Sequence, residues 1–274
     1  MKNGLIKKLG NKELFQVATF RTLWMCEWLG QDFRYFGEID STNSYIKRLK
    51  SDDVSHGLVC LAEYQTGGRG QYNRPWISEA GKNLMFTMVF KPATKYRLFS
   101  LSMVTAHAIA EVIEPKIMKP VRIKWPNDLY VEDRKLGGVL TESIFNGNVL
   151  DRLIIGVGLN INQGSFPMTA GANPISLAET TGSLFNRESL LAQILQNMER
   201  CYLSWERNDS ELIKSVNRRL IGYGRQVKLT IDGKLTEAPY KLLGMDENGH
   251  LVVLDEEMDV ITFTWQQVRV VDGT

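Results

Sequence analysis

The feature that most constrains this chain is a glycine-rich segment with two arginines, directly after a strand-like apolar run. The run covers residues 57–64, and the segment reads GGRGQYNRPW over residues 67–76. Glycine lets backbone N–H groups approach a ligand closely, and arginine offers a planar fork of donors to carboxylate or phosphate. No Gly-Lys-Ser/Thr follows, so the segment is not a Walker loop. We therefore expect a loop that wraps an anionic ligand, with Trp76 as its apolar lid.

A second motif, KWPNDLY at residues 124–130, places a lysine beside two oxygen-bearing side chains. Pro126 presets φ and ends regular strand pairing, so the chain is expected to turn there. An apolar strand follows at residues 154–162, interrupted by Gly156 and Gly158. Glycine inside a strand often marks the close approach of a ligand or of another backbone. We expect these segments to complete the site that the glycine-rich loop begins.

Composition excludes several classes of protein. The 274 residues suffice for one large domain and one small domain. A charged content of 23% and a formal net charge of +2 give no electrostatic case for binding nucleic acid or a membrane surface. The three cysteines are widely spaced and form neither a disulfide framework nor a CxxC pair, which indicates a reducing, cytoplasmic location. No apolar run reaches the roughly 18–20 residues that span a bilayer.

Periodicity predicts strands and helices that do not alternate strictly, which favours an α+β sheet. The expected strands of the larger part are residues 34–39, 57–64, 83–91, 121–124, 128–131, 135–145 and 149–162. The expected helices are residues 13–29, 44–49, 99–113, 176–180, 186–208 and 210–220. After residue 222 only short strands are expected, at residues 226–231, 235–246, 250–254 and 260–271, which predicts a small barrel.

Taken in order, with Asp-Ser-Thr-Asn-Ser at residues 40–44 upstream, these motifs resemble the biotin protein ligases of the type without an N-terminal DNA-binding domain. The resemblance covers about residues 35–272. It implies a class II synthetase-like α+β catalytic domain at residues 35–220, with a mixed or antiparallel sheet packed with helices. It also implies an SH3-like β-barrel at residues 221–274.

Residues 1–34 form an N-terminal extension in this division. One interpretation is a helix that packs on the domain or on a partner. The other is a translated upstream extension, with Met25 as the true start. The segment is too short for the three helices and wing of a DNA-binding winged helix, so direct DNA binding is not expected.

The resemblance implies ATP-dependent activation of biotin to biotinyl-5'-AMP and transfer of biotin to a lysine of a carrier domain. The carrier would be the biotin carboxyl carrier domain of a biotin-dependent carboxylase, and Mg²⁺ would accompany ATP. Joining a carboxylate to an α-phosphate brings two anions together, so a cation is needed between them. Lys124 and Arg69 are the expected catalytic residues, because the resemblance puts both near the biotin carboxylate and the phosphate.

The resemblance also implies three sets of site residues. Those expected to bind biotin are Ser41, Thr42, Asn43, Gln65, Gly68, Arg69, Gln71, Lys124, Gly156 and Gly158. Those expected to bind ATP or the adenylate are Arg69, Gly70, Trp76, Lys124, Asn127 and Asn160. Oxygen atoms of Asn127 and Asp128 are the expected Mg²⁺ ligands, because Mg²⁺ prefers oxygen.

Simpler structural roles stay open for these residues. Residues 41–43 suit helix capping, residues 126–128 suit a turn, and a lysine at position 124 can be a surface residue at a strand end. Gly156 and Gly158 can serve packing or a bulge, and Trp76 can be a core residue. Lys135 and Gly138 match family positions near the active site, but the sequence assigns no role to Lys135.

One position departs from the family pattern. Gln71 stands where many biotin ligases have a second arginine, and it can hydrogen-bond but brings no charge. We expect somewhat looser retention of the adenylate than in an arginine-bearing relative.

A lipoate or octanoate ligase of the same superfamily would differ at both the GGRG and KWPND motifs. A non-catalytic regulator that binds biotinyl-adenylate and represses transcription is disfavoured by the missing winged helix and the near-neutral charge. A degenerate binding module is disfavoured by Lys124, Arg69 and the glycines. The sequence identifies neither the acceptor protein nor the oligomeric state, and a homodimer is one possibility.

Overall fold

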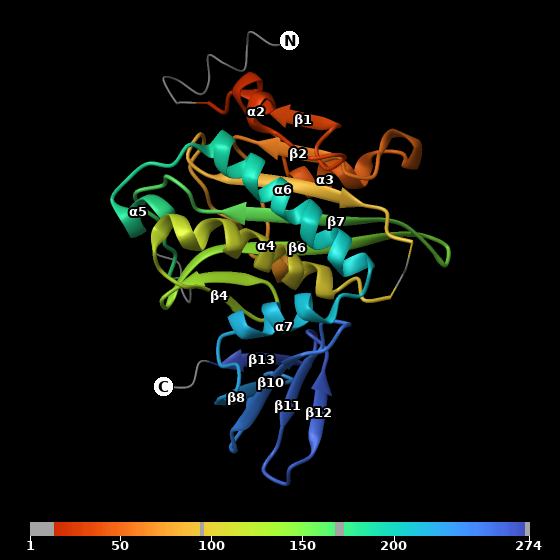
Figure 1. Ribbon diagram of the computed structural model, residues 1–274, viewed down its shortest axis with the longest axis vertical. Coiled ribbons are helices and arrows are strands. Elements are labelled where there is room, and N and C mark those ends of the chain that lie inside the picture. Colours follow the sequence, from red (N-terminus) through yellow and green to blue (C-terminus); the bar gives the residue numbers. More distant parts are fainter. Residues whose placement is uncertain (1–13, 94–95, 168–172, 272–274) are drawn as a thin grey trace.

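The structure is a computed structural model that describes residues 14–93, 96–167 and 173–271. A seven-stranded mixed sheet forms its centre (Figure 1), with strand order β1-β2-β3-β7-β6-β5-β4. Only β1 and β2 run parallel, and every other neighbouring pair is antiparallel. The strands are β1 (Phe33–Phe36), β2 (Val59–Ala62), β3 (Leu84–Phe90), β4 (Val121–Lys124), β5 (Asp128–Val131), β6 (Arg134–Asn146) and β7 (Val149–Leu159).

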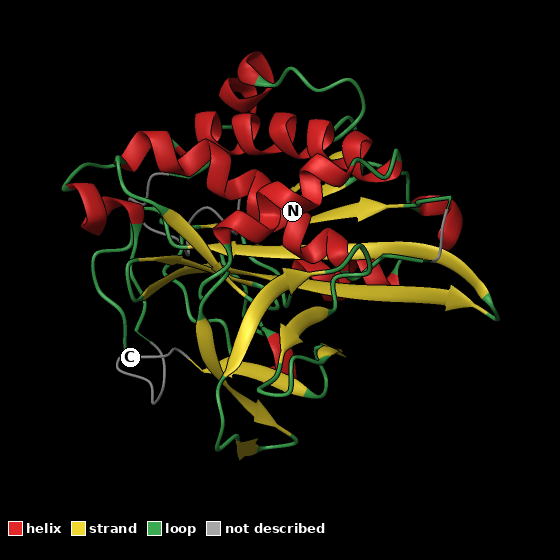
Figure 2. Cartoon of the chain, turned by 60° about the horizontal axis from the view of Figure 1, so that its bottom comes forward, coloured by secondary structure: helices red, strands yellow, loops and turns green. Residues whose placement is uncertain are grey.

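The two long helices, α4 and α6, pack together on one side of this sheet, as Figures 1 and 2 show. The helices are α2 (Val17–Leu23), α3 (Thr42–Arg48), α4 (Ser100–Ile117), α5 (Leu177–Thr181), α6 (Arg187–Glu206) and α7 (Ser210–Arg219). Two short 3₁₀ turns, η1 (Ser51–Asp53) and η2 (Gln71–Asn73), lie in loops. No helix among the described residues is both long and apolar enough to cross a membrane.

Strand β3 shows how the two faces of the sheet differ. Its residues 84, 86, 88 and 90 enter the large core beneath α4 and α6. Residues 85, 87 and 89 point to the opposite face, because successive side chains of a strand alternate. There Val89 packs with Ile46 of α3 in a smaller core. The candidate site lies on this second face, beside α3.

The segment before β1 belongs to the large core, so the expected boundary at residue 35 is not a packing boundary. Phe15 and Phe20 are buried, and α2 packs on α6. The backbone N–H of Phe15 donates to the Glu63 carboxylate at 2.6 Å, and Arg187 forms a buried ion pair with Glu63 at 2.8 Å. Residues 14–34 are therefore integral to the domain, whereas residues 1–13 lie outside the described part.

The helix expected over residues 13–29 is shorter than predicted, because α2 ends at Leu23. Beyond it, the carboxylate of Glu199 on α6 accepts the backbone N–H groups of residues 27, 28 and 29, at 2.8–2.9 Å. These bonds to a distant helix replace the local i to i−4 bonds that would continue the helix. The apolar spacing alone does not reveal that competition.

The C-terminal part forms a second, curled antiparallel sheet, drawn in blue in Figure 1. Its strands are β8 (Gln226–Ile231), β9 (Lys234–Leu235), β10 (Tyr240–Met245), β11 (Leu251–Leu254), β12 (Val260–Phe263) and β13 (Val268–Val271). The strand expected over residues 235–246 is two strands, because Pro239 lacks an N–H for pairing. The strand expected over residues 260–271 also divides, at a turn over residues 264–267. Trp125 ties the two domains together, since its indole N–H donates to the Gly249 carbonyl at 3.0 Å.

Candidate active site

A row of directly paired residues crosses five strands on the face of the sheet that carries α3. Backbone pairing aligns Met85 with Gly158, Gly158 with Gly138, Gly138 with Asp128, and Asp128 with Lys124. The two adjacent glycines leave the middle of the row without side chains. The result is a strip of the sheet face without side chains of its own, which we call the trough, and its outer end carries a carboxylate and a lysine.

A polar cluster lines the inner end of the trough. Thr42 and Asn43 begin α3, and both are buried together with Ser41, the N-cap. The Thr87 hydroxyl lies 2.7 Å from both Thr42 Oγ1 and Asn43 Oδ1. The Gln65 Oε1 atom accepts hydrogen bonds from the Thr42 backbone N–H and hydroxyl, at 2.7 and 3.1 Å. This cluster brings together four of the residues expected from the sequence to bind biotin.

The capping alternative also holds for Ser41, since its Oγ accepts the Ser44 backbone N–H at 3.4 Å. A capping role and a ligand role are compatible, because a hydroxyl has further hydrogen-bonding capacity.

Gly156 and Gly158 have no room for a side chain, because other side chains approach both of them closely. A Cβ on Gly156 would lie 2.3 Å from Asn43 Oδ1, and a Cβ on Gly158 would lie 2.6 Å from the Trp76 ring. Trp76 therefore lies directly over the floor of the trough. Its indole nitrogen is buried and has no hydrogen-bond partner in the part of the chain that the structure describes. A buried donor without a partner is costly, so a ligand acceptor at this point would stabilise the arrangement.

The glycine-rich loop closes on itself as a flap. The Trp76 N–H donates to the Gly68 carbonyl at 2.9 Å, and the Gly70 N–H donates to the Arg74 carbonyl at 2.8 Å. Gln71 begins the 3₁₀ turn at the tip of the flap.

Arg69 points from the loop to the polar cluster. Its guanidinium donates to Ser44 Oγ at 3.0 Å and lies 3.7 Å from Glu142 Oε1. Glu142 also accepts the Asn43 amide at 2.9 Å and pairs with Lys47 at 2.5 Å. Glu142 on β6 thus connects the loop arginine to the polar end of α3.

The two lysines of the site differ in position. Lys135 Nζ lies 2.7 Å from Asp128 Oδ2 and 3.6 Å from the place of a Cβ on Gly138, at the floor of the trough. Lys124 lies on the edge strand β4, two strands from β6, with its Nζ 5.6 Å from the centre of the Tyr130 ring. Lys135 thus lies beside the glycine floor, whereas Lys124 stands opposite Asp128 at the end of the paired row.

The predicted residues Asn127 and Asn160 stabilise the turns near the two lysines. The Asn127 amide donates to the Val139 carbonyl at 2.8 Å, which fixes the turn that follows Pro126. The Asn160 amide donates to the carbonyls of Ile175 and Lys135, at 3.1 and 3.4 Å. Both side-chain amides therefore donate to backbone carbonyls. For Asn127, this is the structural role in a turn that was the alternative to Mg²⁺ binding.

Asp128 fits Mg²⁺ better than Asn127 does. Its Oδ1 atom is buried, has no hydrogen-bond partner among the described residues and lies beside Gly138. An ionised carboxylate oxygen is a suitable ligand for the Mg²⁺ that accompanies ATP.

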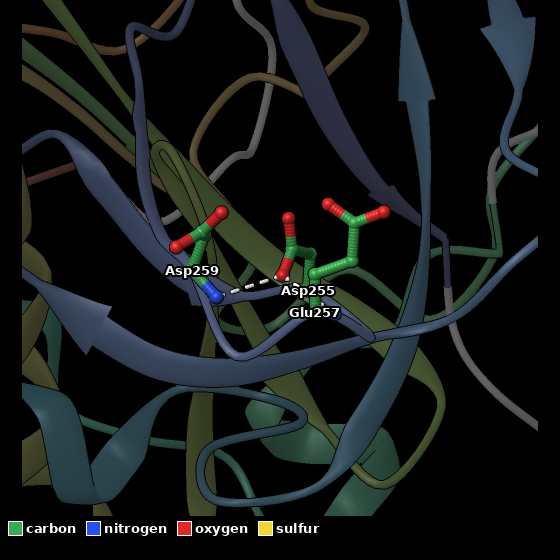
Figure 3. A group of neighbouring side chains, drawn as sticks. All are labelled: Asp255, Glu257 and Asp259. Carbon is green, nitrogen blue, oxygen red and sulfur yellow. Dashed lines mark hydrogen bonds between the residues drawn. The ribbon is translucent and has the colours of Figure 1, made fainter.

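A separate acidic group lies on the C-terminal domain, formed by Asp255, Glu257 and Asp259 (Figure 3). Asp255 Oδ1 accepts the backbone N–H groups of Glu257 and Asp259, at 3.0 and 2.8 Å. That carboxylate stabilises the turn between β11 and β12, and the group is not part of the trough.

A cavity of about 510 Å³ opens between the loop and the C-terminal domain. Loop residues 69–73 form one wall, β6 residues 140–143 form another, and Trp265 with the start of α4 completes it. Beyond Val139, β6 pairs with β7 alone, so its other edge faces this opening.

Sequence reasoning missed Thr87, Glu142 and the position of Lys135. Thr87 had a signal, because it is the one polar residue of a seven-residue apolar strand. Glu142 had no signal in the local sequence, because it lies beside α3 only through the strand register of the whole sheet.

The fold and the trough define an α+β ligand-binding domain, closed by an arginine-bearing loop, with a small β-domain attached. Residues 35–160 match the sequence model of the biotin/lipoate A/B protein ligase family. The bifunctional ligase/repressor BirA of Escherichia coli is 32% identical over 232 residues, covering 83% of this chain and 70% of that protein. This chain belongs to the biotin/lipoate A/B protein ligase family.

A second relative and a solved structure are also similar to this chain. The biotin–[acetyl-CoA-carboxylase] ligase of Mycobacterium tuberculosis is 26% identical over 201 residues, covering 70% of this chain and 72% of that protein. Among solved structures, the biotin protein ligase of Aquifex aeolicus in complex with biotin and ATP superposes with a TM-score of 0.76 at 28% identity. It covers 89% of this chain and 100% of that one.

Proposed function

We propose that this chain is an ATP-dependent biotin–protein ligase, which forms biotinyl-5'-AMP and transfers biotin to a lysine of a carrier domain. The observation that carries the proposal is the glycine-floored trough, with uncharged polar groups at one end and the Lys135–Asp128 pair at the other. Biotin has the matching shape, with a neutral ureido ring at one end and a carboxylate at the other. The relatives named above support the same assignment.

The polar cluster suits the ureido ring. That ring presents one carbonyl acceptor and two N–H donors, and hydroxyl and amide groups can meet all of them. Ser41, Thr42, Asn43 and Gln65 supply such groups on one side, and Thr87 adds a hydroxyl from the sheet. The Trp76 ring now lies against Gly158, so it would move away from the glycine floor to admit the ring system and would then cover it together with Gly68.

The charged end of the trough suits the reaction. Attack of the biotin carboxylate on the α-phosphate forms a C–O–P linkage and releases pyrophosphate, so no covalent enzyme intermediate is needed. Arg69 and the two lysines would reduce the repulsion between the anions. We place Lys135 closest to the reacting oxygens and retain Lys124 as a second cation of the site.

ATP enters with Mg²⁺ as part of the substrate. Asp128 would hold the ion, and Asn127 and Asn160 would keep the surrounding turns in place. Gly70 and Gln71 would lie over the phosphates when the loop is closed, and Trp76 would limit the access of water to the adenylate.

The transfer step requires an amine to reach the adenylate. The 510 Å³ cavity beside Arg69 offers an entrance, and the free edge of β6 offers backbone groups for strand pairing with a carrier domain. The carrier would be the biotin carboxyl carrier domain of a biotin-dependent carboxylase. A homodimer, if one forms, would use the same edge.

We also propose that the chain has two domains. Residues 35–220, together with residues 14–34, form the domain that holds the trough. Residues 221–274 form a second domain that contacts the glycine-rich loop. The three cysteines are buried thiols, and a cytoplasmic location suits them and the supply of ATP.

Transfer of labelled biotin from the purified chain to an isolated carrier domain tests the proposal. The expected result is ATP-dependent labelling of the carrier lysine, which is lost when that lysine is replaced by arginine. Failure to label any carrier, with biotin and ATP in excess, would contradict it.

A further inference from the structure

The tip of the glycine-rich loop lies against the C-terminal domain. The Arg269 guanidinium carbon lies 4.9 Å from the centre of the Tyr72 ring, a cation–π distance. The Trp265 ring lies on another side of Tyr72, with centroids 6.3 Å apart and planes tilted by 54°. Tyr72 is 58% exposed even with these contacts, and among the described residues its ring contacts are with Arg269 and Trp265 of the C-terminal domain.

The surface on which the Tyr72 ring packs is itself fixed by contacts of Arg269 and Trp265. The Arg269 guanidinium donates to the backbone carbonyls of Trp265 and Val268, the latter at 2.6 Å. Trp265 stacks on Phe99 at the start of α4, with centroids 5.9 Å apart and an interplanar angle of 19°. Phe99 in turn lies edge-on to Trp125 at 6.3 Å. The receiving surface is therefore anchored to both domains.

The loop adopts an unfavourable backbone conformation to make this contact. Tyr72 and Asn73 both have φ of 56°, in the left-handed region. That region is uncommon for a bulky aromatic residue. Two backbone hydrogen bonds support the turn from within, since the Gly70 N–H donates to the Arg74 carbonyl at 2.8 Å and the Arg74 N–H donates to the Gln71 carbonyl at 3.2 Å. The docked ring adds a contact outside the loop that helps to offset the backbone cost.

We propose that Tyr72 is a positioning residue that holds the glycine-rich loop closed over the trough by docking on Arg269 and Trp265. Tyr72 lies three residues after Arg69, so its attachment fixes the far end of the segment that carries this arginine. The C-terminal domain thereby controls opening of the loop. The consequence for the reaction rests on the proposed function: the contact slows release of biotinyl-adenylate, at a loop where Gln71 supplies no charge.

Limited proteolysis without any ligand tests the contact. Trypsin can cut after Arg69 only when the loop leaves Ser44 and Glu142, and the Arg74–Pro75 bond is resistant. Cleavage then reports the open population. For Tyr72→Ala we expect cleavage at Arg69–Gly70 to be about threefold to tenfold faster, given usual cation–π and aromatic contacts. Arg269→Gln should have a smaller effect of the same sign.

Three variants make the test specific. Tyr72→Phe keeps the ring and should match the wild type, because the contact uses the ring face. The double variant Tyr72→Ala/Arg269→Gln should open no faster than Tyr72→Ala, since both changes remove one interaction. Tyr223→Ala, another half-exposed tyrosine, should have no effect. Wild-type cleavage in Tyr72→Ala, or additive effects in the double variant, would overturn the proposal.

Release of the adenylate tests the consequence. After a single turnover with biotin and ATP, Tyr72→Ala should release biotinyl-5'-AMP about threefold to tenfold faster, with its rate of formation within about twofold of wild type. Equal release would show that the contact does not retain the intermediate. If the wild-type chain forms no adenylate, the proposed function fails, whereas the proteolysis result still decides whether Tyr72 closes the loop.

Discussion

The ammonium group of Lys135 lies 2.7 Å from the carboxylate of Asp128, at the end of a trough whose floor is two glycines. The two residues come from adjacent strands, and the backbone opposite Asp128 is Gly138. The place of a Cβ on Gly138 is 2.9 Å from Asp128 Oδ1 and 3.6 Å from Lys135 Nζ, so both charged groups lie at the floor. A fixed cation at this point stabilises negative charge that develops when a carboxylate and a phosphate meet.

The first prediction concerns this lysine. Lys135→Met should slow adenylate formation by about 100-fold, because preorganised charge is removed from the reacting oxygens. Lys124→Met should have a smaller effect, since Lys124 lies on the edge strand β4, two strands from the strand that carries Lys135. Single-turnover formation of biotinyl-5'-AMP measures both. Lys119→Met, at an exposed ion pair with Glu132, is the matched control. A larger loss for Lys124→Met than for Lys135→Met would restore Lys124 as the central cation.

The second prediction concerns the glycine floor. Gly156→Ala places a methyl group where Asn43 now lies, 2.3 Å from its Oδ1 atom, so Asn43 must move. We expect the KM for biotin to rise at least about tenfold while the KM for ATP changes little, because one methyl group costs roughly 1–3 kcal/mol when it overpacks a core. Gly164→Ala adds the same methyl group in open space and should behave as wild type. An unchanged KM for biotin in Gly156→Ala would remove the inner trough from biotin recognition.

The third prediction concerns the segment before β1. Phe20 is fully buried, so Phe20→Ala should lower the free energy of unfolding by about 3–5 kcal/mol. Thr19→Ala, exposed on the same helix, should change it by less than about 0.5 kcal/mol. Denaturant unfolding measures both. A chain that begins at Met25 would lose Phe15, Phe20 and a hydrogen bond to buried Glu63, and should not fold stably. Wild-type stability of that shortened chain would mean that the segment is dispensable.

The fourth prediction concerns pH. His107 is 4% exposed, and burial lowers the pKa of its imidazole from 6.5 to about 4, although Glu111 nearby acts in the opposite direction. Between these values the unfolded chain takes up a proton that the folded chain does not, so stability falls as the pH is lowered. From pH 7 to pH 5 the loss due to His107 should be about 2 kcal/mol.

His107→Gln provides the comparison, because glutamine does not titrate. Glu111, Glu114, Arg200 and Arg219 surround the imidazole and remain in both proteins. Denaturant unfolding at pH 7 and pH 5 should show a smaller acid loss in His107→Gln by about 2 kcal/mol. Equal losses in the two proteins would mean that His107 takes up a proton in the folded state.

Much of the fold could be predicted from the sequence, because its signals are local. Strand β3 is a continuous apolar run, α4 and α6 carry apolar residues at helical spacing, and β8 has the predicted bounds. In the C-terminal sheet, turn residues mark the strands predicted at residues 226–231 and 250–254, but the two longer predicted strands are each divided in two. The error at α2 arose because Glu199, about 170 residues away, accepts the N–H groups that would have continued the helix.

The site was predictable only in part, for a similar reason. Arg69, the glycines and the polar residues at the start of α3 stand in recognisable motifs, and the structure brings them together. The choice between Lys124 and Lys135 depends on strand order, which places Lys124 on an edge strand and Lys135 beside the floor of the trough. The contacts of Glu142 and the packing of Tyr72 on the C-terminal domain join residues from three separate segments of the sequence. No motif in the sequence encodes those contacts.

The most direct test of the account is ATP–pyrophosphate exchange on the purified chain, with biotin, lipoate or octanoate as the only acid. Exchange requires the acid and ATP to meet in one site and form the adenylate reversibly, and it needs no carrier domain. We expect exchange with biotin and little with the two other acids. Exchange with lipoate or octanoate but not biotin would contradict the substrate, and absence of exchange with all three would contradict the reaction itself.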